Sequence, residues 1–176
     1  MTAQLDQGNA AGRGKSQQDV DSLMSELASA DPVTRERARL ALIEKGDEAV
    51  PALIDALTHP RTQTRWEAAK ALVENSNPAS ASSLVRALED TDAGVRWLAA
   101  EALIALQGDA LTPLLHALID RPDSPWLREG AHHVLHELMG GGCGKWLAPV
   151  LAALEDATPE EVVSLAAESA LNALAD

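Results

Sequence analysis

The sequence predicts an all-α protein, and two observations support this prediction: the composition and an internal repeat. Ala and Leu together account for 59 of the 176 residues, whereas Phe and Tyr are absent. Ala and Leu favour helices, while strands are enriched in β-branched and aromatic residues. A core built from Ala and Leu suits closely packed helices, so the composition argues against an all-β fold.

One motif recurs along the chain as an arginine with Ala three residues later, Ala six later and Leu seven later. Its arginines are Arg35, Arg65 and Arg96, spaced 30 and 31 residues apart. A fourth copy has Arg128 in the arginine position, and a fifth has Ser164 there and keeps the apolar positions. Because these offsets place the apolar side chains on one helix face, each copy predicts an amphipathic helix.

A leucine-containing motif precedes each arginine copy and repeats in step with it. Its copies span residues 23–27, 53–57, 84–88, 114–118 and 150–154. Two motifs that cycle together indicate a two-helix unit repeated five times. After a flexible polar tail at residues 1–16, the repeat domain covers residues 17–176. We place the repeats at about residues 17–46, 47–77, 78–108, 109–143 and 144–176.

Residues that favour helix ends flank the expected helices. Asp31 and Ser124 each precede a proline, which is typical of an N-cap followed by Pro in the first turn. Asp92 is a further candidate N-cap, and the segment 158–161 has the pattern of a capping box. The second helices of three units are expected to end near Gly46, Gly108 and Gly140.

The repeat resembles the HEAT-repeat superfamily, most closely its short-unit branch that is also found in phycobilisome bilin lyases. The residues that carry the resemblance are the first-helix leucines and the second-helix motif, as in residues 92–103. The resemblance covers about residues 17–175 and implies a right-handed α-solenoid of five two-helix repeats. Ser164 and a glycine-rich insertion at residues 140–144 depart from the pattern and favour a capping role for the fifth unit. The resemblance further implies that the arginines pair with turn acids in a structural ladder of Asp31, Arg35, Arg65, Asp92, Arg96 and Arg128.

In such stacks the second helices line the concave face, where positions one, four, five and eight after the arginine point away from the predicted core. The middle of this face carries Trp66 and Trp97 at the same repeat position, so we expect them to lie side by side on adjacent second helices. They either fill space between neighbouring helices or anchor a partner, and the sequence leaves both readings open. Trp126 and Trp146 lie in or beside turns, where we expect local packing. The predicted partner-binding surface comprises Trp66, Lys70, Val73, Trp97, Glu101, Ile104, Glu129, His132 and His136.

Histidines on the fourth second helix are the candidates for cofactor chemistry. His132 and His136 share one helical face, and a spacing of four residues can chelate a metal ion. His133 flanks them, and Cys143 follows in the glycine-rich insertion. A metal or cofactor site would use His132, His133, His136 and Cys143. The alternatives are an exposed or partly packed histidine-rich helix and a pH-sensitive partner contact.

The charge balance argues against several classes of partner. Lys and Arg number 14 and Asp and Glu 27, which gives a formal net charge of −13. Such a chain repels nucleic acid and anionic membrane surfaces. No apolar stretch is long enough for a transmembrane helix, the first residues lack the apolar core of a secretory signal, and the single cysteine suits a reducing compartment. We therefore expect a cytoplasmic protein.

These observations predict a non-enzymatic protein–protein interaction module, that is, a scaffold, adaptor or assembly factor with no cofactor expected. Its partner would be a protein that presents an apolar helix or peptide with basic residues nearby. The alternative is a cofactor- or metal-handling protein, bilin-lyase-like or a metal chaperone, built on the histidines. We expect a monomer or a weak homo-oligomer, because no repeat follows Leu171 and Leu174 to cover them.

Overall fold

The structure, a computed structural model, describes residues 19–140, 144–155 and 160–175, and every regular element within them is a helix. The predicted all-α class is therefore confirmed. The expected tail at residues 1–16, the capping box that starts at Thr158, and Cys143 lie outside the described residues.

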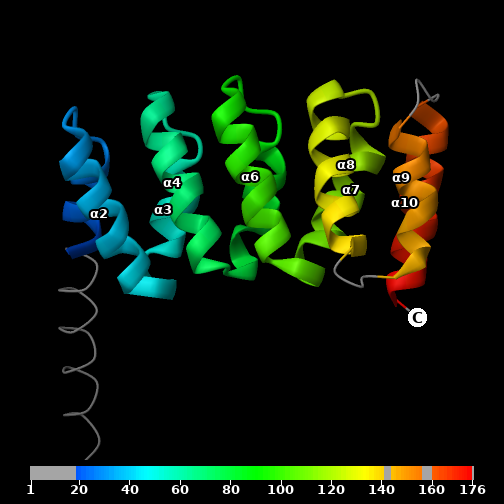
Figure 1. The fold of residues 1–176 in the computed structure, drawn as a ribbon, viewed down its shortest axis with the longest axis horizontal. Coiled ribbons are helices and arrows are strands. Elements are labelled where there is room, and N and C mark those ends of the chain that lie inside the picture. The colour runs from blue at the N-terminus through cyan, green and yellow to red at the C-terminus, as the bar shows by residue number, and fades with distance from the viewer. Residues whose placement is uncertain (1–18, 141–143, 156–159, 176) are drawn as a thin grey trace, which may run out of the picture. The chain divides into compact units, whose positions relative to one another are not determined.

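The helices follow one another in pairs (Figure 1). The first helices are residues 19–27, α3 (Val50–Ala56), α5 (Ala81–Ala87), α7 (Leu111–Asp120) and α9 (Ala148–Glu155). The second helices are α2 (Pro32–Lys45), α4 (Thr62–Asn75), α6 (Ala93–Ala105), α8 (Pro125–Gly140) and α10 (Glu160–Ala175). Short 3-10 helices lead into the next pair at η1 (Gly46–Glu48), η2 (Pro78–Ser80), η3 (Gln107–Ala110) and η4 (Lys145–Leu147).

The predicted N-caps of three second helices are confirmed. Asp31 accepts a hydrogen bond from the Thr34 amide at 2.9 Å, and Asp92 accepts one from the Val95 amide at 3.1 Å. The Ser124 hydroxyl accepts one from the amide three residues ahead in the same way. The Thr34 hydroxyl, which donates to Asp31 at 2.6 Å, is the main cause that lowers the pKa of this carboxyl below its usual value.

The second helices end close to the predicted glycines. Gly46 is the C-cap of α2 with a φ of 57°, a conformation that glycine adopts without the steric cost a Cβ would bring. Gly140 is the last residue of α8. The prediction is wrong for Gly108, because α6 ends earlier, at Ala105, and Gly108 belongs to η3.

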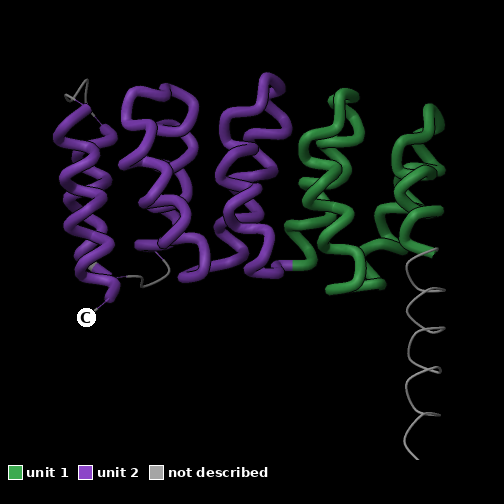
Figure 2. The backbone as a smooth tube through the Cα atoms, turned by 180° about the vertical axis from the view of Figure 1, so that it is seen from behind, with its two compact units in different colours: residues 1–75 green, residues 76–176 purple. Residues whose placement is uncertain are grey.

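The chain divides into two compact units, residues 1–75 and 76–176 (Figure 2). In the first unit α4 packs against both α2 and α3. In the second unit α6 packs on α5 and α8, and α5 packs on α7. Helix pairs that bury their apolar sides against neighbouring pairs make this an all-α solenoid. The right hand of the solenoid concerns the whole chain and stays a prediction.

The core lies between the helix pairs and is built from the repeated small and branched apolar side chains. Positions three, six and seven after each arginine slot are buried, except for Ala41 and Leu171, which are half-buried. Leu42, Leu72, Leu103 and Leu135, all at position seven, are fully buried. The regular offsets in the sequence therefore identify the core face of the second helices correctly.

The fifth helix pair is stacked differently from the others. Elsewhere within each unit, second helices contact second helices, as α2 does with α4 and α6 with α8, and the first helix α5 contacts the first helix α7. In the fifth pair, by contrast, the first helix α9 packs on the second helix α8, and the second helix α10 packs on the first helix α7. Across these contacts Arg128 Nη2 donates to the Ala153 carbonyl at 3.3 Å, and Ser164 Oγ donates to the Ile119 carbonyl at 3.5 Å. The two helices have exchanged layers, and the sequence spacing from Arg128 to Ser164 is correspondingly long at 36 residues. The expectation that every second helix lines one face is therefore wrong for α10.

Candidate functional site

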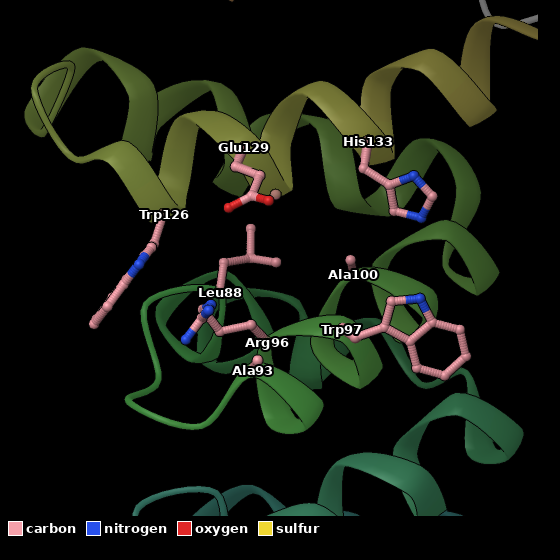
Figure 3. Close-up of a pocket in the computed structure, with 9 residues that line it drawn as sticks. Leu88, Ala93, Arg96, Trp97, Ala100, Trp126, Glu129 and His133 are labelled. Atoms are coloured by element: carbon pink, nitrogen blue, oxygen red, sulfur yellow. The ribbon is translucent and has the colours of Figure 1, made fainter.

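A groove opens on the second unit between the neighbouring helices α6 and α8 (Figure 3). Its volume is about 230 Å³. The groove is lined by Leu88, Ala93, Arg96, Trp97, Ala100, Trp126, Glu129, Gly130 and His133. Two tryptophans lie at opposite ends of it, and the small apolar residues lie between them. We call this site the α6/α8 groove.

Trp97 is the most exposed aromatic side chain of the groove. Its residue is 59% exposed, although the neighbouring Val95, Leu98 and Ala99 are buried. The helical register set by the Asp92 N-cap turns these neighbours into the core and leaves the indole on the surface. The sequence left open whether Trp97 fills space between helices or lies on the surface, and the geometry favours a surface indole.

Trp126 lines the other end of the groove and is 43% exposed. The Arg96 guanidinium carbon lies 4.6 Å from the centroid of the Trp126 ring, a cation–π arrangement. The expectation of mere local packing is therefore wrong for Trp126. The sequence did not predict this contact, because Arg96 and Trp126 are 30 residues apart and belong to different repeats. Trp126 also precedes the arginine of its repeat, so it does not share the repeat position of Trp66 and Trp97.

Gly130 allows helix α8 to pack closely on Leu88. A Cβ atom at this position would lie 2.9 Å from Leu88 Cδ2 and 3.3 Å from Leu88 Cδ1. Glycine inside a helix costs stability relative to alanine, so its presence here has a packing reason. The absence of a side chain lets the α8 backbone approach Leu88 closely at the base of the groove.

The polar side chains that line the groove are Arg96, Glu129 and His133. His133 Nε2 lies 3.3 Å from Glu101 Oε1 and links α8 to α6. Glu129 is exposed and has no ion pair within the part of the chain that the structure describes. The Arg96 guanidinium is held by backbone carbonyls in addition to Trp126. The groove therefore combines exposed indole surface with an unpaired carboxylate.

The predicted partner-binding residues divide between the two units. Trp66, Lys70 and Val73 lie on α4 and are half-buried, and Lys70 Nζ lies 4.8 Å from the centroid of the Trp66 ring. The expectation that Trp66 and Trp97 are neighbours concerns both units and stays a prediction. In the second unit, the remaining predicted residues on α6 and α8 are half-buried or exposed: Trp97, Glu101, Ile104, Glu129, His132 and His136.

The exposed face of the second helices is narrower than the one predicted from positions one, four, five and eight after the repeat arginine. Position four after the arginine is buried at Arg39, Ala69 and Ala100, because it packs against a neighbouring element. Position five at Glu101 and position one at Trp97 remain accessible. A helix whose flanks both touch neighbours exposes a stripe narrower than half its circumference.

The recurring arginines bind the turn before their own helix through its carbonyls. In four copies Nη1 donates to the carbonyl oxygen six residues earlier, at 3.0 Å for Arg35, 3.0 Å for Arg65, 2.8 Å for Arg96 and 3.3 Å for Arg128. The predicted ladder is therefore wrong about its partners, since Asp31 and Asp92 act as N-caps. A carbonyl acceptor does not depend on the side chain, which explains why the arginine recurs while the turn residues vary.

The first unit contains a buried ion pair that the sequence did not predict. Arg39 Nη1 lies 2.6 Å from Glu67 Oε2, and both side chains are nearly inaccessible, at 9% and 5%. Glu67 Oε1 also accepts hydrogen bonds from Arg35 Nε at 3.3 Å and Gln63 Nε2 at 3.2 Å. The available signal was an acid at position two after Arg65, where the other copies carry no acid.

The three histidines of α8 do not converge. His132 Nε2 lies 3.7 Å from Glu155 Oε1 on α9, whereas His133 is paired with Glu101 on α6. His132 and His136 stack at 6.1 Å between ring centroids, as their spacing predicts. Residues one position apart point about 100° from each other around a helix, so His133 faces a different neighbour. Within the described residues no group of three or more His, Cys, Asp or Glu side chains is arranged to hold a metal ion.

Two family models match the chain. Residues 20–104 match the model of HEAT repeats, and residues 95–120 match the model of the PBS lyase HEAT-like repeat. No curated protein matches the chain. Across the described residues, no helix has the length and apolar character needed to cross a membrane.

Proposed function

Because the chain is a HEAT-repeat protein whose repeats resemble those of phycobilisome lyases, we propose that it is a protein-interaction module without an enzymatic activity of its own. HEAT repeats commonly mediate protein interaction. The module would act as a scaffold, adaptor or assembly factor. Its single cysteine fits a reducing compartment such as the cytoplasm.

The observation that carries this proposal is the exposed Trp97 at the wall of the α6/α8 groove. Isolated apolar residues on a surface are common, but contiguous apolar surface marks interaction sites. Here the 59% exposed Trp97 and the 43% exposed Trp126 belong to one groove with an apolar base. Tryptophan is enriched at binding hot spots, because it buries a large area with few rotatable bonds and keeps a polar N–H.

A partner would reach this surface with an apolar segment that enters the groove between the indoles. Truncating a hot-spot tryptophan costs about 2 kcal/mol or more of binding free energy, which is about a thirtyfold loss of affinity. Trp97→Ala is suitable for this test because the residue lies on the surface and its loss leaves the buried core intact.

The experiment is an affinity capture from native lysate with the wild type, the Trp97→Ala variant and a Leu165→Ala control. Leu165 is 67% exposed on α10 and lies outside the groove, so its truncation removes a similar kind of exposed apolar surface. We expect proteins that the wild type and the control retain and that the Trp97→Ala variant loses. Identical protein sets from all three baits would contradict a role of this surface in partner binding.

The match of residues 95–120 to the PBS lyase HEAT-like repeat supports a second candidate, a protein that handles a bilin or a metal ion. His132 and His136 would supply adjacent imidazoles for such a ligand, and Cys143 is the nearest thiol in sequence. Titration of the purified chain with Zn²⁺, and separately with a bilin, tests this candidate by calorimetry and absorbance. Stoichiometric binding that His132→Ala abolishes would favour it over the adaptor.

A further inference from the structure

Three tryptophans lie on second helices, and two of them carry a cation supplied by the chain itself. Lys70 Nζ lies 4.8 Å from the Trp66 ring, and the Arg96 guanidinium lies 4.6 Å from the Trp126 ring. A cation over the face of an indole is attracted by the ring quadrupole, and the attraction is stronger where water is excluded. Within the described residues no such cation lies over Trp97.

The difference between Trp66 and Trp97 arises from one position of the repeat. Both follow the repeat arginine directly, and in each case the residue four positions later lies on the same helical face. That residue is Lys70 in the second repeat and Glu101 in the third. The third repeat therefore keeps the aromatic surface and replaces the cation that covers it with an acid.

The charges around Trp97 fit a cation that comes from outside. Glu101 Oε1 lies 3.3 Å from His133 Nε2, while Glu129 has no ion pair within the described residues. Two cations of the second unit are already engaged, Arg96 by carbonyls and an indole and Arg121 by Glu89. A groove that presents an exposed indole and a free carboxylate has the two features that recognise Lys and Arg side chains.

The second unit is also the strongly acidic part of the protein. Residues 76–176 contain five Lys and Arg against 15 Asp and Glu, a net charge of −10, whereas residues 1–75 contain nine against 12, a net charge of −3. A partner segment with positive charge would be drawn to the second unit by this field, and the α6/α8 groove would then fix its register.

We propose that the α6/α8 groove binds a basic linear segment of a partner protein, with a Lys or Arg side chain over the Trp97 indole and an adjacent apolar side chain between Trp97 and Trp126. This inference rests on the proposed function and specifies the chemistry of the partner. The cation takes the place that Lys70 occupies over Trp66, and Glu129 lines the same groove with a carboxylate that has no ion pair within the described residues. The apolar neighbour reaches the base of the groove, which Leu88 and Gly130 line.

The test uses peptides selected by the full-length chain from a random 12-residue display library. The selected peptides are synthesised with a fluorescent label, and their dissociation constants are measured by anisotropy in 150 mM salt. Enrichment of Lys or Arg next to an apolar residue is expected, and replacing that cation by Gln should weaken binding about tenfold. Selected peptides that are acidic, or that bind equally well after the replacement, overturn the proposal.

Two charge-matched variants locate the binding site. Glu101→Lys copies the second repeat, since it places a lysine four residues after Trp97 and covers the indole from within the chain. It should weaken peptide binding about tenfold or more, and so should Trp97→Ala. Glu168→Lys makes the same charge change on an exposed position of α10 and should alter binding less than about twofold, after salt screening of the general field. Equal losses in Glu101→Lys and Glu168→Lys would show non-specific attraction and overturn the groove assignment.

Failure of this inference is distinguishable from failure of the proposed function. If captured proteins still depend on Trp97 while no basic peptide does, the interaction module stands and the cation chemistry is wrong. If neither captured proteins nor peptides depend on Trp97, both proposals fail. Circular dichroism of each variant confirms that the helices are intact before binding is compared.

Discussion

The buried carboxylate of Glu67 offers a sharp test of how the first unit is held together. In Glu67→Ala, Arg39 would lose the partner that lies 2.6 Å away while its own side chain stays 9% exposed. Arg35 and Gln63 would each lose an acceptor at the same time. The other acid near Arg39 is Glu36 at 3.8 Å, which is largely exposed and holds the guanidinium weakly.

The expected cost follows from leaving one charge buried without a counter-charge. Removing one partner of a buried ion pair destabilises a protein by about 3–5 kcal/mol, which is a large part of the stability of a small domain. Replacing both partners by apolar residues of similar volume is often neutral, so Arg39→Met with Glu67→Leu should recover most of the loss. The exposed pair of Arg37 and Glu26, 3.3 Å apart and 73% and 38% accessible, is the matched control. Its loss in Arg37→Ala should cost less than about 1 kcal/mol.

The assay is urea unfolding of the full chain followed by circular dichroism, combined with hydrogen exchange measured by mass spectrometry. Exchange is needed because two compact units need not unfold in one transition, and peptides from α2 and α4 report on the first unit separately. Faster exchange confined to α2 and α4 in Glu67→Ala is the expected pattern. A cost below about 1 kcal/mol for Glu67→Ala, similar to that of Arg37→Ala, would refute the view that this pair is desolvated.

Three further predictions concern helix ends and close packing. The pKa of Asp31 is lowered in the folded protein, so the stabilising contribution of its carboxylate is complete above pH 3.8 and is lost as the pH falls through the lower folded-state value. The difference in unfolding free energy between wild type and Asp31→Ala, measured by urea unfolding, should therefore shrink in acid. Gly46→Ala should destabilise α2 by about 1 kcal/mol, read as a lower urea midpoint, because a Cβ is strained at a φ of 57°. Gly140→Ala should stabilise α8 slightly, whereas Gly130→Ala should lower the thermal midpoint because its Cβ meets Leu88; equal shifts in both variants would contradict the close approach.

Sequence periodicity was sufficient to locate the helices and their core faces. The spacing of Ala and Leu after each arginine reflects the 3.6-residue period of a helix, and this period depends on local geometry alone. Capping residues act through backbone groups two or three positions away, so Asp31, Asp92 and Ser124 could also be read from the chain. The α6/α8 groove could be predicted in part, since the repeat position of Trp97 and the acidity around it are visible in the sequence.

The remaining features depend on contacts between residues about 30 or more positions apart. The pairing of Arg39 with Glu67, the stacking of Arg96 on Trp126, and the close approach of Gly130 to Leu88 each join two different helix pairs. The exchange of layers by α9 and α10 is of the same kind, because the apolar pattern of a helix specifies which side is buried and leaves open which neighbour buries it. By itself, the sequence of this protein thus determined the helices and their buried sides through local backbone geometry. The tertiary structure decided which helices became neighbours, and with them the groove, because packing partners are selected by shape and charge across the chain.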